Sequence, residues 1–425
     1  MRIAVIGAGI IGITTAYELA ADGHEVTVFE RRGAAAEETS FANAGVVAPG
    51  SVTPWAAPGM PGKVLGSLLS RHAAVKLSLP LSGDDLTWMW KWWRACKLEI
   101  YLANRARLQR LAFYSHHRLR HLTAKLQLEY DRSEGYTVLL RSEKDSRLVQ
   151  PGLQVLRDAG VAFSEIDAVA VRKIEPAINP ETEFLGGVHL PDDEVANCRQ
   201  FALLLKDVTR DLGVKFEFNT TVDQINCAQA ASILIASEST PRQFDRVVMC
   251  AGLASAALLK PLGLKIPMAA VYGYSISAPI REALNAPRSA LMDEHYKVAI
   301  SRLGNRVRVA GSAEIGGSLM KHRASSIQTL YKVLHDWFPG AANLNNSRAN
   351  TGASVQLWKG ARPMLPDGPP LIGKSGIPGL WLNLGHGSSG WALSCGSARA
   401  LADEMAGQNA DIDMDGFRLS RLAAY

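Results

Sequence analysis

Three glycines near the start of the chain have the spacing of a phosphate-binding turn. Gly7, Gly9 and Gly12 follow a short apolar run and open a helical pattern. The first glycine permits a tight turn, the second lets an anion approach the backbone, and the third lets the helix pack closely on the strand. The N–H groups around Ile10 and Ile11, at the start of this helix, favour a bound pyrophosphate.

A second apolar strand, residues 25–29, follows that helix and ends on an acidic residue. Glu30 stands where a carboxylate accepts hydrogen bonds from an adenosine ribose, and Arg31 comes directly after it. Strand, turn, helix, strand and acid in this order predict a dinucleotide-binding βαβ unit. The alternative is a glycine-rich turn in an unrelated α/β protein.

Another glycine-rich turn joins a predicted strand, residues 380–384, to a helix that begins near Ala392. This turn, residues 385–391, directs a second helix N-terminus at an electron-rich group. A reduced flavin accumulates negative charge around N1 and the C2 carbonyl, and such a terminus would stabilise that charge. For His386, within the turn, a purely structural role is the alternative.

Two further segments carry polar groups that are suited to binding. Residues 39–45, Thr-Ser-Phe-Ala-Asn-Ala-Gly, gather small and hydrogen-bonding residues that can lie close to a phosphate or a flat ring. Arg362 lies between Gly360 and Pro363, where a stiffened backbone suits bidentate pairing of the guanidinium with a carboxylate. The alternatives are an ordinary polar turn and a surface arginine in a proline-rich loop.

Length and composition predict a folded protein of two domains, since the chain has 425 residues, 47% of them hydrophobic and 20% charged. Five cysteines, spread widely and without a CxxC pair, argue against disulfides and zinc, so we expect no metal and a reducing compartment.

The early position of Gly7 predicts that no signal peptide is cleaved, and no apolar run is long enough to span a membrane. We therefore expect a cytoplasmic protein. Its net charge of +6 is weak evidence for anionic partners.

The remaining patterns alternate between strands and helices, as in an α/β protein whose second domain interrupts the first. Residues 49–83 are rich in Pro, Gly and Ser and predict a long loop. We expect strands at 136–141, 216–223, 244–252, 266–278, 290–302 and 306–314, and helices at 199–212 and 327–338.

The segment from residue 50 to residue 100 combines an apolar loop with tryptophan and basic residues. Five of the nine tryptophans lie between Trp55 and Trp93, and the stretch from Lys91 to Lys125 holds nine basic residues and one acid. One interpretation of this pattern is peripheral contact with an anionic membrane, at the inner face of the cytoplasmic membrane. A core helix with a solvated basic face is the alternative. We expect no nucleic-acid partner, because no recognisable binding module accompanies the charge.

Motifs in order along nearly the whole chain resemble the D-amino-acid oxidase type of FAD-dependent oxidoreductases, and within it the small-subunit type of bacterial D-amino-acid dehydrogenase. They are the N-terminal turn, TSFANAG, PWAAPGMP with its tryptophan-rich helix, PDDE near Asp193, CAGLAS, GYS, WKGARPMLPDG and GHGSSGW. The resemblance implies a Rossmann-type FAD-binding domain made of residues 1–85, 198–262 and 350–425. It also implies a discontinuous α+β substrate domain made of residues 86–197 and 263–349.

The resemblance also implies roles for individual residues. Arg362 grips the carboxylate of the substrate, and Tyr272 and Tyr274 lie on a strand of the active site. Because no cysteine or histidine matches a flavin attachment motif, we expect non-covalent FAD. Its binding residues are expected to be Gly7, Gly9, Ile10, Ile11 and Gly12 at the pyrophosphate; Glu30 and Arg31 near the ribose; Ser40, Asn43, Ala44 and Gly45 near the pyrophosphate and flavin; Val222 at the adenine; Cys250, Ala251 and Gly252 in the inner turn; and Gly385, His386, Gly387, Ser388, Ser389 and Gly390 at the pyrimidine edge of the flavin.

Two departures from the family pattern put the exact substrate in doubt. The chain has Tyr272-Gly273-Tyr274 where the dehydrogenases usually have Lys-Gly-Tyr. It has Ala196-Asn197 where they often have Gly-Asp before the cysteine.

The resemblance implies hydride transfer from Cα of a D-amino acid to flavin N5, with release of a 2-oxo acid and ammonia after hydrolysis. Electrons then pass to a quinone or another electron-transfer carrier rather than to oxygen. One alternative is an enzyme of the same fold that acts on cis-4-hydroxy-D-proline, D-proline, sarcosine or glycine. Another is a nucleotide-binding subunit without activity. A nicotinamide-only dehydrogenase is disfavoured, because it has no use for the second glycine-rich turn.

Overall fold

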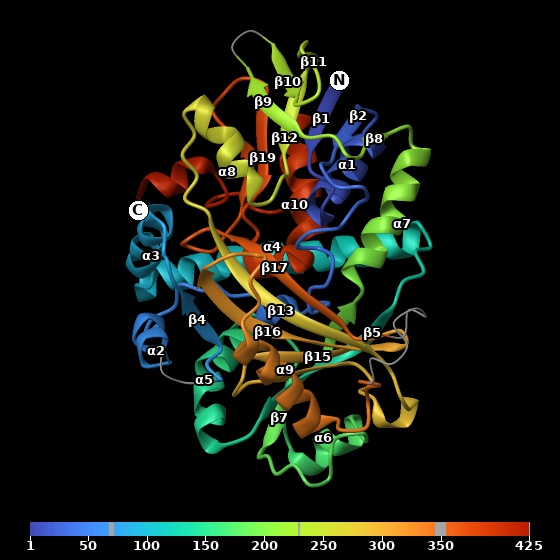
Figure 1. Cartoon of the computed structure of the whole chain (residues 1–425), viewed down its shortest axis with the longest axis vertical. Helices are drawn as coiled ribbons and strands as arrows, with labels where there is room; N and C mark the ends of the chain where they lie inside the picture. Colours follow the sequence, from blue (N-terminus) through green and yellow to red (C-terminus); the bar gives the residue numbers. More distant parts are fainter. Residues whose placement is uncertain (68–71, 228–229, 345–353, 425) are drawn as a thin grey trace.

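Two β-sheets dominate the computed structural model, which describes residues 1–67, 72–227, 230–344 and 354–424. A six-stranded sheet lies in the upper half of Figure 1 and a ten-stranded sheet lies in the lower half. The chain passes between them several times, so that both sheets combine segments from distant parts of the sequence. The expected domain boundary at residues 349 and 350 lies outside the described residues.

The six-stranded sheet is the Rossmann-type unit. Its strand order is β18–β19–β12–β1–β2–β8, and every neighbouring pair except β18–β19 is parallel. Such sheets bury both faces, which explains why β1 and β2 are continuous apolar runs. The strands are β1 (Arg2–Ile6), β2 (Glu25–Phe29), β8 (Lys215–Glu217), β12 (Arg246–Met249), β18 (Leu371–Lys374) and β19 (Leu380–Leu384).

Four helices cover one face of this sheet, and a small antiparallel sheet joins the core on the other. Helix α1 (Ile10–Ala21) packs against α7 (Cys198–Asp211) and α10 (Gly390–Met405), and α10 packs against α4 (Leu98–Lys125). Although α4 lies in the range expected for the substrate domain, its leucines belong to the core around α1. The small sheet consists of β9 (Val222–Asn226), β10 (Ala231–Ile235) and β11 (Arg242–Phe244).

The ten-stranded sheet is mostly antiparallel, with the order β17–β13–β16–β15–β14–β5–β7–β3, while β4 pairs with β16 and β6 pairs with β7. Helix α9 (Ala324–Trp337) covers the back of β13, β15 and β16. The strands are β3 (Val46–Val47), β4 (Val75–Ser78), β5 (Arg132–Leu140), β6 (Ser164–Asp167), β7 (Gly186–Ala196), β13 (Ala269–Pro279), β14 (Ala290–Asp293), β15 (Val298–Leu303), β16 (Arg306–Gly316) and β17 (Gln356–Met364). The other helices are α2 (Met60–Ser67), α3 (Gly83–Ala95), α5 (Glu143–Asp158), α6 (Ala168–Ile174) and α8 (Ala254–Leu259).

Several elements differ from the sequence-based expectations. Residues 216–223 do not form one strand but the ends of two, β8 and β9, and residues 290–302 form the hairpin β14–β15. The predicted loop 49–83 contains α2 and β4, while its residues 68–71 lie outside the described part. Strands β4 and β17, both within ranges expected for the FAD-binding domain, belong to the larger sheet.

Within the described ranges, we find no helix that combines the length and the apolar character needed to cross a membrane.

Candidate active site

A large cavity of about 1200 Å³ lies between the two sheets. It exceeds the range of about 300–1,000 Å³ that is usual for a single small-molecule site, as expected for a dinucleotide together with a substrate. Every residue that the sequence analysis assigned to the site borders this cavity except Gly12. The structure therefore brings together segments from both ends of the chain.

The N-terminal turn has the geometry that its glycines predict. Gly7 has a φ of +103°, and a Cβ there would lie 2.7 Å from the carbonyl oxygen of Cys250. A Cβ on Gly12 would lie 1.8 Å from the carbonyl oxygen of Gly7, so Gly12 serves the packing of α1 on β1 rather than the lining of the cavity. Gly9, by contrast, has room on its cavity side, where the nearest atom to a Cβ is Ser40 Oγ at 3.5 Å.

Glu30 closes the turn at the end of β2. Its Oε2 accepts a hydrogen bond from the backbone N–H of Ala8, and its Oε1 accepts one from Arg32, both at 2.8 Å. A carboxylate offers about four acceptor positions, so two remain for hydroxyl groups in the cavity. Arg31 is exposed and pairs with Glu38, with its Nε 2.9 Å from Glu38 Oε1.

The segment 39–45 bridges the two sheets. Ser40 Oγ accepts a hydrogen bond from the N–H of Ile10 at 3.0 Å, on the side of the six-stranded sheet. On the other side, Ser275 Oγ donates to the carbonyl of Ala42 at 2.9 Å and Ser301 Oγ donates to the carbonyl of Ala44 at 2.7 Å. The polar turn is thereby fixed along the wall of the cavity.

The C-terminal glycine-rich turn places the start of α10 at the cavity. His386 lies directly before that start, but its side chain is buried and its Nε2 contacts Ser397 Oγ at 3.1 Å. Burial lowers the pKa of His386 to about 3, so the imidazole is neutral and a weak base. Nearby, Asn383 Oδ1 is buried at the cavity and receives no hydrogen bond from any described residue.

The inner turn after β12 and the start of β9 complete the nucleotide side of the cavity. Cys250, Ala251 and Gly252 follow β12, and Val222 opens β9. Burial raises the pKa of the Cys250 thiol to about 12, so this cysteine is an unreactive packing residue rather than a nucleophile.

Arg362 lies on β17 at the edge of the ten-stranded sheet, not in a loop. Its Nη1 donates a hydrogen bond to the carbonyl of Ser312 at 3.0 Å, and its guanidinium lies against Gly273, where a Cβ would be 2.4 Å from Nη2. Desolvation lowers the pKa of Arg362 to about 10, which leaves the group charged at neutral pH.

The two tyrosines of the expected active-site strand reach the cavity from a different face of the sheet than Arg362 does. In the pairing of β13 with β17, Val271 faces Arg362, Tyr272 faces Ala361 and Tyr274 faces Lys359. Because side chains alternate between faces and directly paired residues share one, Tyr272 and Tyr274 lie on the face opposite Arg362. Both tyrosines border the cavity together with Arg362, and their place in the active site stays a prediction.

The Tyr274 side chain is buried and donates a hydrogen bond to Glu314. Burial and this bond raise its pKa. Sequence reasoning missed both Glu314 and Ser312. No local signal marks either residue, since their roles depend on the register of β13 against β16.

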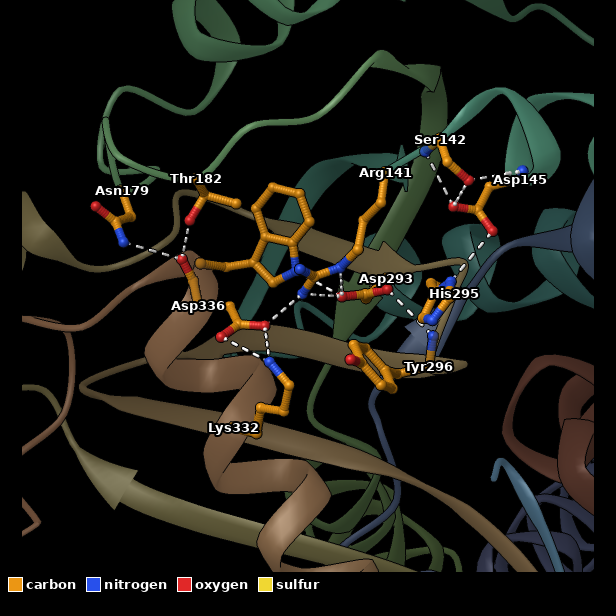
Figure 2. Close-up of polar contacts among 11 residues, drawn as sticks. Arg141, Ser142, Asp145, Asn179, Thr182, Asp293, His295, Tyr296, Lys332 and Asp336 are labelled. Carbon is orange, nitrogen blue, oxygen red and sulfur yellow. Dashed lines mark hydrogen bonds and ion pairs between the residues drawn. The ribbon is translucent and has the colours of Figure 1, made fainter. Parts of the chain in front are cut away.

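A second polar cluster lies elsewhere in the ten-stranded sheet and outside the lining of the cavity. Figure 2 shows Arg141 at its centre, with Nη2 2.7 Å from Asp293 and 2.8 Å from Asp336. The guanidinium carbon lies 4.8 Å from the ring centroid of Trp337, which itself donates to Asp293 at 2.7 Å. The cluster joins the ends of β5, β14 and α9, which is a structural role.

Comparisons with known proteins agree with this geometry. The model of the family described as FAD dependent oxidoreductase matches residues 2–404. D-amino acid dehydrogenase of Bradyrhizobium diazoefficiens is 40% identical over 100% of this chain and 99% of its own length. The protein of the same name from Cereibacter sphaeroides is 41% identical, over 100% of this chain and 96% of its own.

Solved structures share the fold at low identity. Glycine oxidase of Geobacillus kaustophilus has a TM-score of 0.74 at 20% identity, with 99% of both chains covered. L-alpha-glycerophosphate oxidase of Mycoplasma pneumoniae, solved with FAD bound, has a TM-score of 0.67 at 17% identity, covering 98% of this chain and 97% of its own.

The glycine-rich turn, the carboxylate of Glu30, the unsatisfied acceptor of Asn383 and the start of α10 all border one dinucleotide-sized cavity, and they fit FAD. The family match confirms the resemblance found in the sequence. This chain belongs to the FAD dependent oxidoreductase family.

Proposed function

We propose that this chain is a D-amino acid dehydrogenase, which converts D-amino acids to 2-oxo acids and ammonia. The observation that carries the proposal is the charged guanidinium of Arg362 in the same cavity as the flavin-binding turns. Full-length relatives at 40–41% identity that bear this name support it. When bound, FAD supplies the acceptor for the hydride that leaves Cα of the substrate.

Arg362 binds the substrate in this proposal. Within the described residues, its hydrogen bond to the carbonyl of Ser312 engages one of five N–H donors, so the guanidinium keeps donors for a carboxylate. Two parallel charge-assisted bonds fix the position and the orientation of the carboxylate. That orientation decides which face of Cα is presented, and hence which enantiomer reacts.

Among the residues that the structure describes, none supplies a strong base beside Arg362. His386 is neutral and directed at Ser397, and the Tyr274 hydroxyl is directed at Glu314 on the other face of the sheet. We therefore infer that the substrate binds with its amine already neutral. The lone pair of the amine then assists departure of the hydride, and water hydrolyses the product.

We further propose that non-covalently bound FAD is held by the assigned turns, with Glu30 at the ribose and the start of α10 at the pyrimidine edge. Electrons then leave to a quinone or another carrier. For this route we propose contact with an anionic membrane surface through α3 and the start of α4. Trp90 and Trp93 are about half exposed and pack against each other, with ring centroids 5.1 Å apart and ring planes tilted by 33°. Exposed Arg94 and Lys97 lie beside them.

The test is anaerobic. The purified holoprotein is mixed with D- and L-amino acids one at a time, and the visible flavin band is followed. We expect several D-amino acids to bleach it, while their L forms do not. Bleaching only by D-proline, cis-4-hydroxy-D-proline, sarcosine or glycine would favour the enzymes of the same fold. A flavin that no member of the panel reduces would contradict the proposal and favour a non-catalytic subunit.

A further inference from the structure

A buried ion pair lies behind Arg362, on the opposite face of the same strands. Lys359 Nζ lies 2.8 Å from Glu314 Oε2, and the two side chains are 1% and 4% exposed. Lys359 also donates to the carbonyls of Ser318 and Lys321, both at 2.8 Å. An ammonium group has three donors, so this lysine is fully satisfied within the protein.

The carboxylate of Glu314 gathers further partners from neighbouring elements. It accepts hydrogen bonds from the hydroxyls of Tyr274 on β13 and Ser78 on β4. Arg323 Nε lies 3.7 Å from it, and the N–H of Arg323 donates to the Tyr274 hydroxyl at 3.1 Å. Burial opposes ionisation, but the bonds from Lys359, Ser78 and Tyr274 outweigh it and lower the pKa of Glu314. The carboxyl group of Glu314 is therefore ionised.

This network encloses the irregularity in the sheet that supports Arg362. Tyr272 pairs with Glu314, but Tyr274 pairs with Gly311, so one residue of β13 faces two of β16 in a β-bulge. Within the bulge, Ser312 has a φ of +61°, which is unfavourable for a residue with a side chain. The carbonyl of this strained residue accepts the hydrogen bond from Arg362.

The three strands that carry Arg362, Gly273 and Ser312 are the strands that Lys359, Tyr274 and Glu314 tie together from behind. A buried ion pair contributes little to stability on its own, because desolvation of both charges offsets their attraction. A fully satisfied buried network does fix a unique local geometry. Because the network around Glu314 connects the three strands at the bulge, it is placed to fix the conformation of the bulge.

We propose that Lys359 and Glu314 are positioning residues, which hold the bulge at Ser312 so that the Arg362 guanidinium meets the substrate carboxylate. This inference rests on the proposed function above. The pair acts through Ser312 and the strand register, because the ammonium group of Lys359, which borders the cavity, is fully engaged within the protein. It also anchors residues 318–321, of which Leu319 borders the cavity.

The test replaces the pair by apolar side chains of similar size, in the double variant Glu314→Leu/Lys359→Met. Such a replacement keeps packing and leaves neither charge of the buried pair alone, while Arg323, which also lies near Glu314, is 35% exposed to solvent. The measurement is anaerobic flavin reduction, which gives the apparent Kd and limiting rate for a D-amino acid of the panel and for its carboxamide. We expect the Kd of the acid to rise at least about tenfold, because misplaced binding groups are costly. The Kd of the carboxamide should change little.

Two further variants make the outcome decisive. Glu314→Gln keeps the size and hydrogen-bonding capacity of the side chain, and should raise the Kd of the acid by a smaller factor even if the double variant does not fold. Arg141→Met breaks a comparable buried ion pair outside the cavity, and should lower the melting temperature without changing either Kd.

An unchanged Kd for the acid in a folded, FAD-loaded variant would overturn the inference, as would an equal loss for the acid and the carboxamide. Neither result would contradict the proposed function, provided that D-amino acids still bleach the flavin of the wild-type protein. If the wild type is not bleached, the proposed function fails first.

Discussion

Arg362 carries a positive charge into a cavity where a neutral carbonyl, that of Ser312, is its hydrogen-bond partner among the described residues. A desolvated guanidinium without a counter-ion is costly, and the lowered pKa of about 10 reflects that cost. A substrate carboxylate would supply the missing charge. Arg362 is thus suited to bind an anion, and we therefore assign it a role in substrate binding rather than a purely structural role.

Replacement of this arginine should weaken substrate binding far more than it weakens FAD binding. For Arg362→Ala, we expect kcat/KM for D-amino acids to fall by roughly 10²–10⁴-fold, since two charge-assisted hydrogen bonds are lost and each contributes about 1.5–3 kcal/mol. Steady-state kinetics and the FAD content of the purified protein are the measurements. Arg210→Ala, on an exposed face of α7, is the control and should behave like wild type. Unchanged kinetics in Arg362→Ala would remove this residue from the site.

At the scale of elements, the segment 39–45 depends on both sheets for its conformation. Ser301 on β15 and Ser275 on β13 donate to its carbonyls, while Ser40 accepts from the start of α1. A turn that is fixed at both sides approaches a ligand without an ordering cost at the moment of binding. The ten-stranded sheet therefore contributes to cofactor binding, although the nucleotide turns belong to the other sheet.

Removal of one of these anchors should loosen FAD. We expect Ser301→Ala to raise the dissociation constant of FAD by about two- to tenfold, since a hydrogen bond contributes about 0.5–1.5 kcal/mol. Ser232→Ala removes a matched hydroxyl from β10, whose partner is the carbonyl of Asn226 at 3.4 Å, and should leave the constant unchanged. Apoprotein titrated with FAD gives both values, and equal constants for the two variants would contradict the anchoring role.

Sequence patterns predicted the elements whose signals are local. The strands around Gly7 and the turn before α10 were located from glycine spacing and apolar runs alone. Chain reversals without glycine were missed: Asn219 and Lys297 adopt positive φ angles of 55° and 53°, where the sequence suggested continuous strands. The alternative of a surface arginine in a proline-rich loop does not describe Arg362, because Pro363 lies in β17, an edge strand that tolerates proline.

The site was less predictable than the elements, because register decides which side chains share a face. Tyr272 and Tyr274 alternate with Gly273, and nothing in this tripeptide says which set faces the cavity. Glu314 and Lys359 meet only because β13 lies between β16 and β17. Such contacts follow from tertiary pairing, so a single sequence cannot give them.

For the molecule as a whole, α3 has one buried face, as a core helix would, and one exposed aromatic face, as a membrane-contacting helix would. Trp88 and Trp92 are buried in a core with residues of β13 and β16, and Trp88 Nε1 donates to the carbonyl of Met364 at 2.8 Å. Trp90 and Trp93 face outward with Leu86. In Figure 1, α3 lies on the flank of the molecule, beside α2 and β4. One helix thus supports the substrate side of the cavity and presents an aromatic surface.

We predict that the exposed aromatic surface of α3 binds an anionic bilayer, because indole rings beside basic groups suit its headgroup region. The protein should sediment with vesicles that contain phosphatidylglycerol, and less so at high salt. Trp90→Ala/Trp93→Ala should reduce binding about tenfold or more, since each ring loses apolar burial worth over 1 kcal/mol. Leu284→Ala, at another exposed apolar residue, is the control and should bind like wild type. If the wild-type protein stays in the supernatant with anionic vesicles, α3 does not serve as a membrane contact, and electrons must leave through a diffusible carrier.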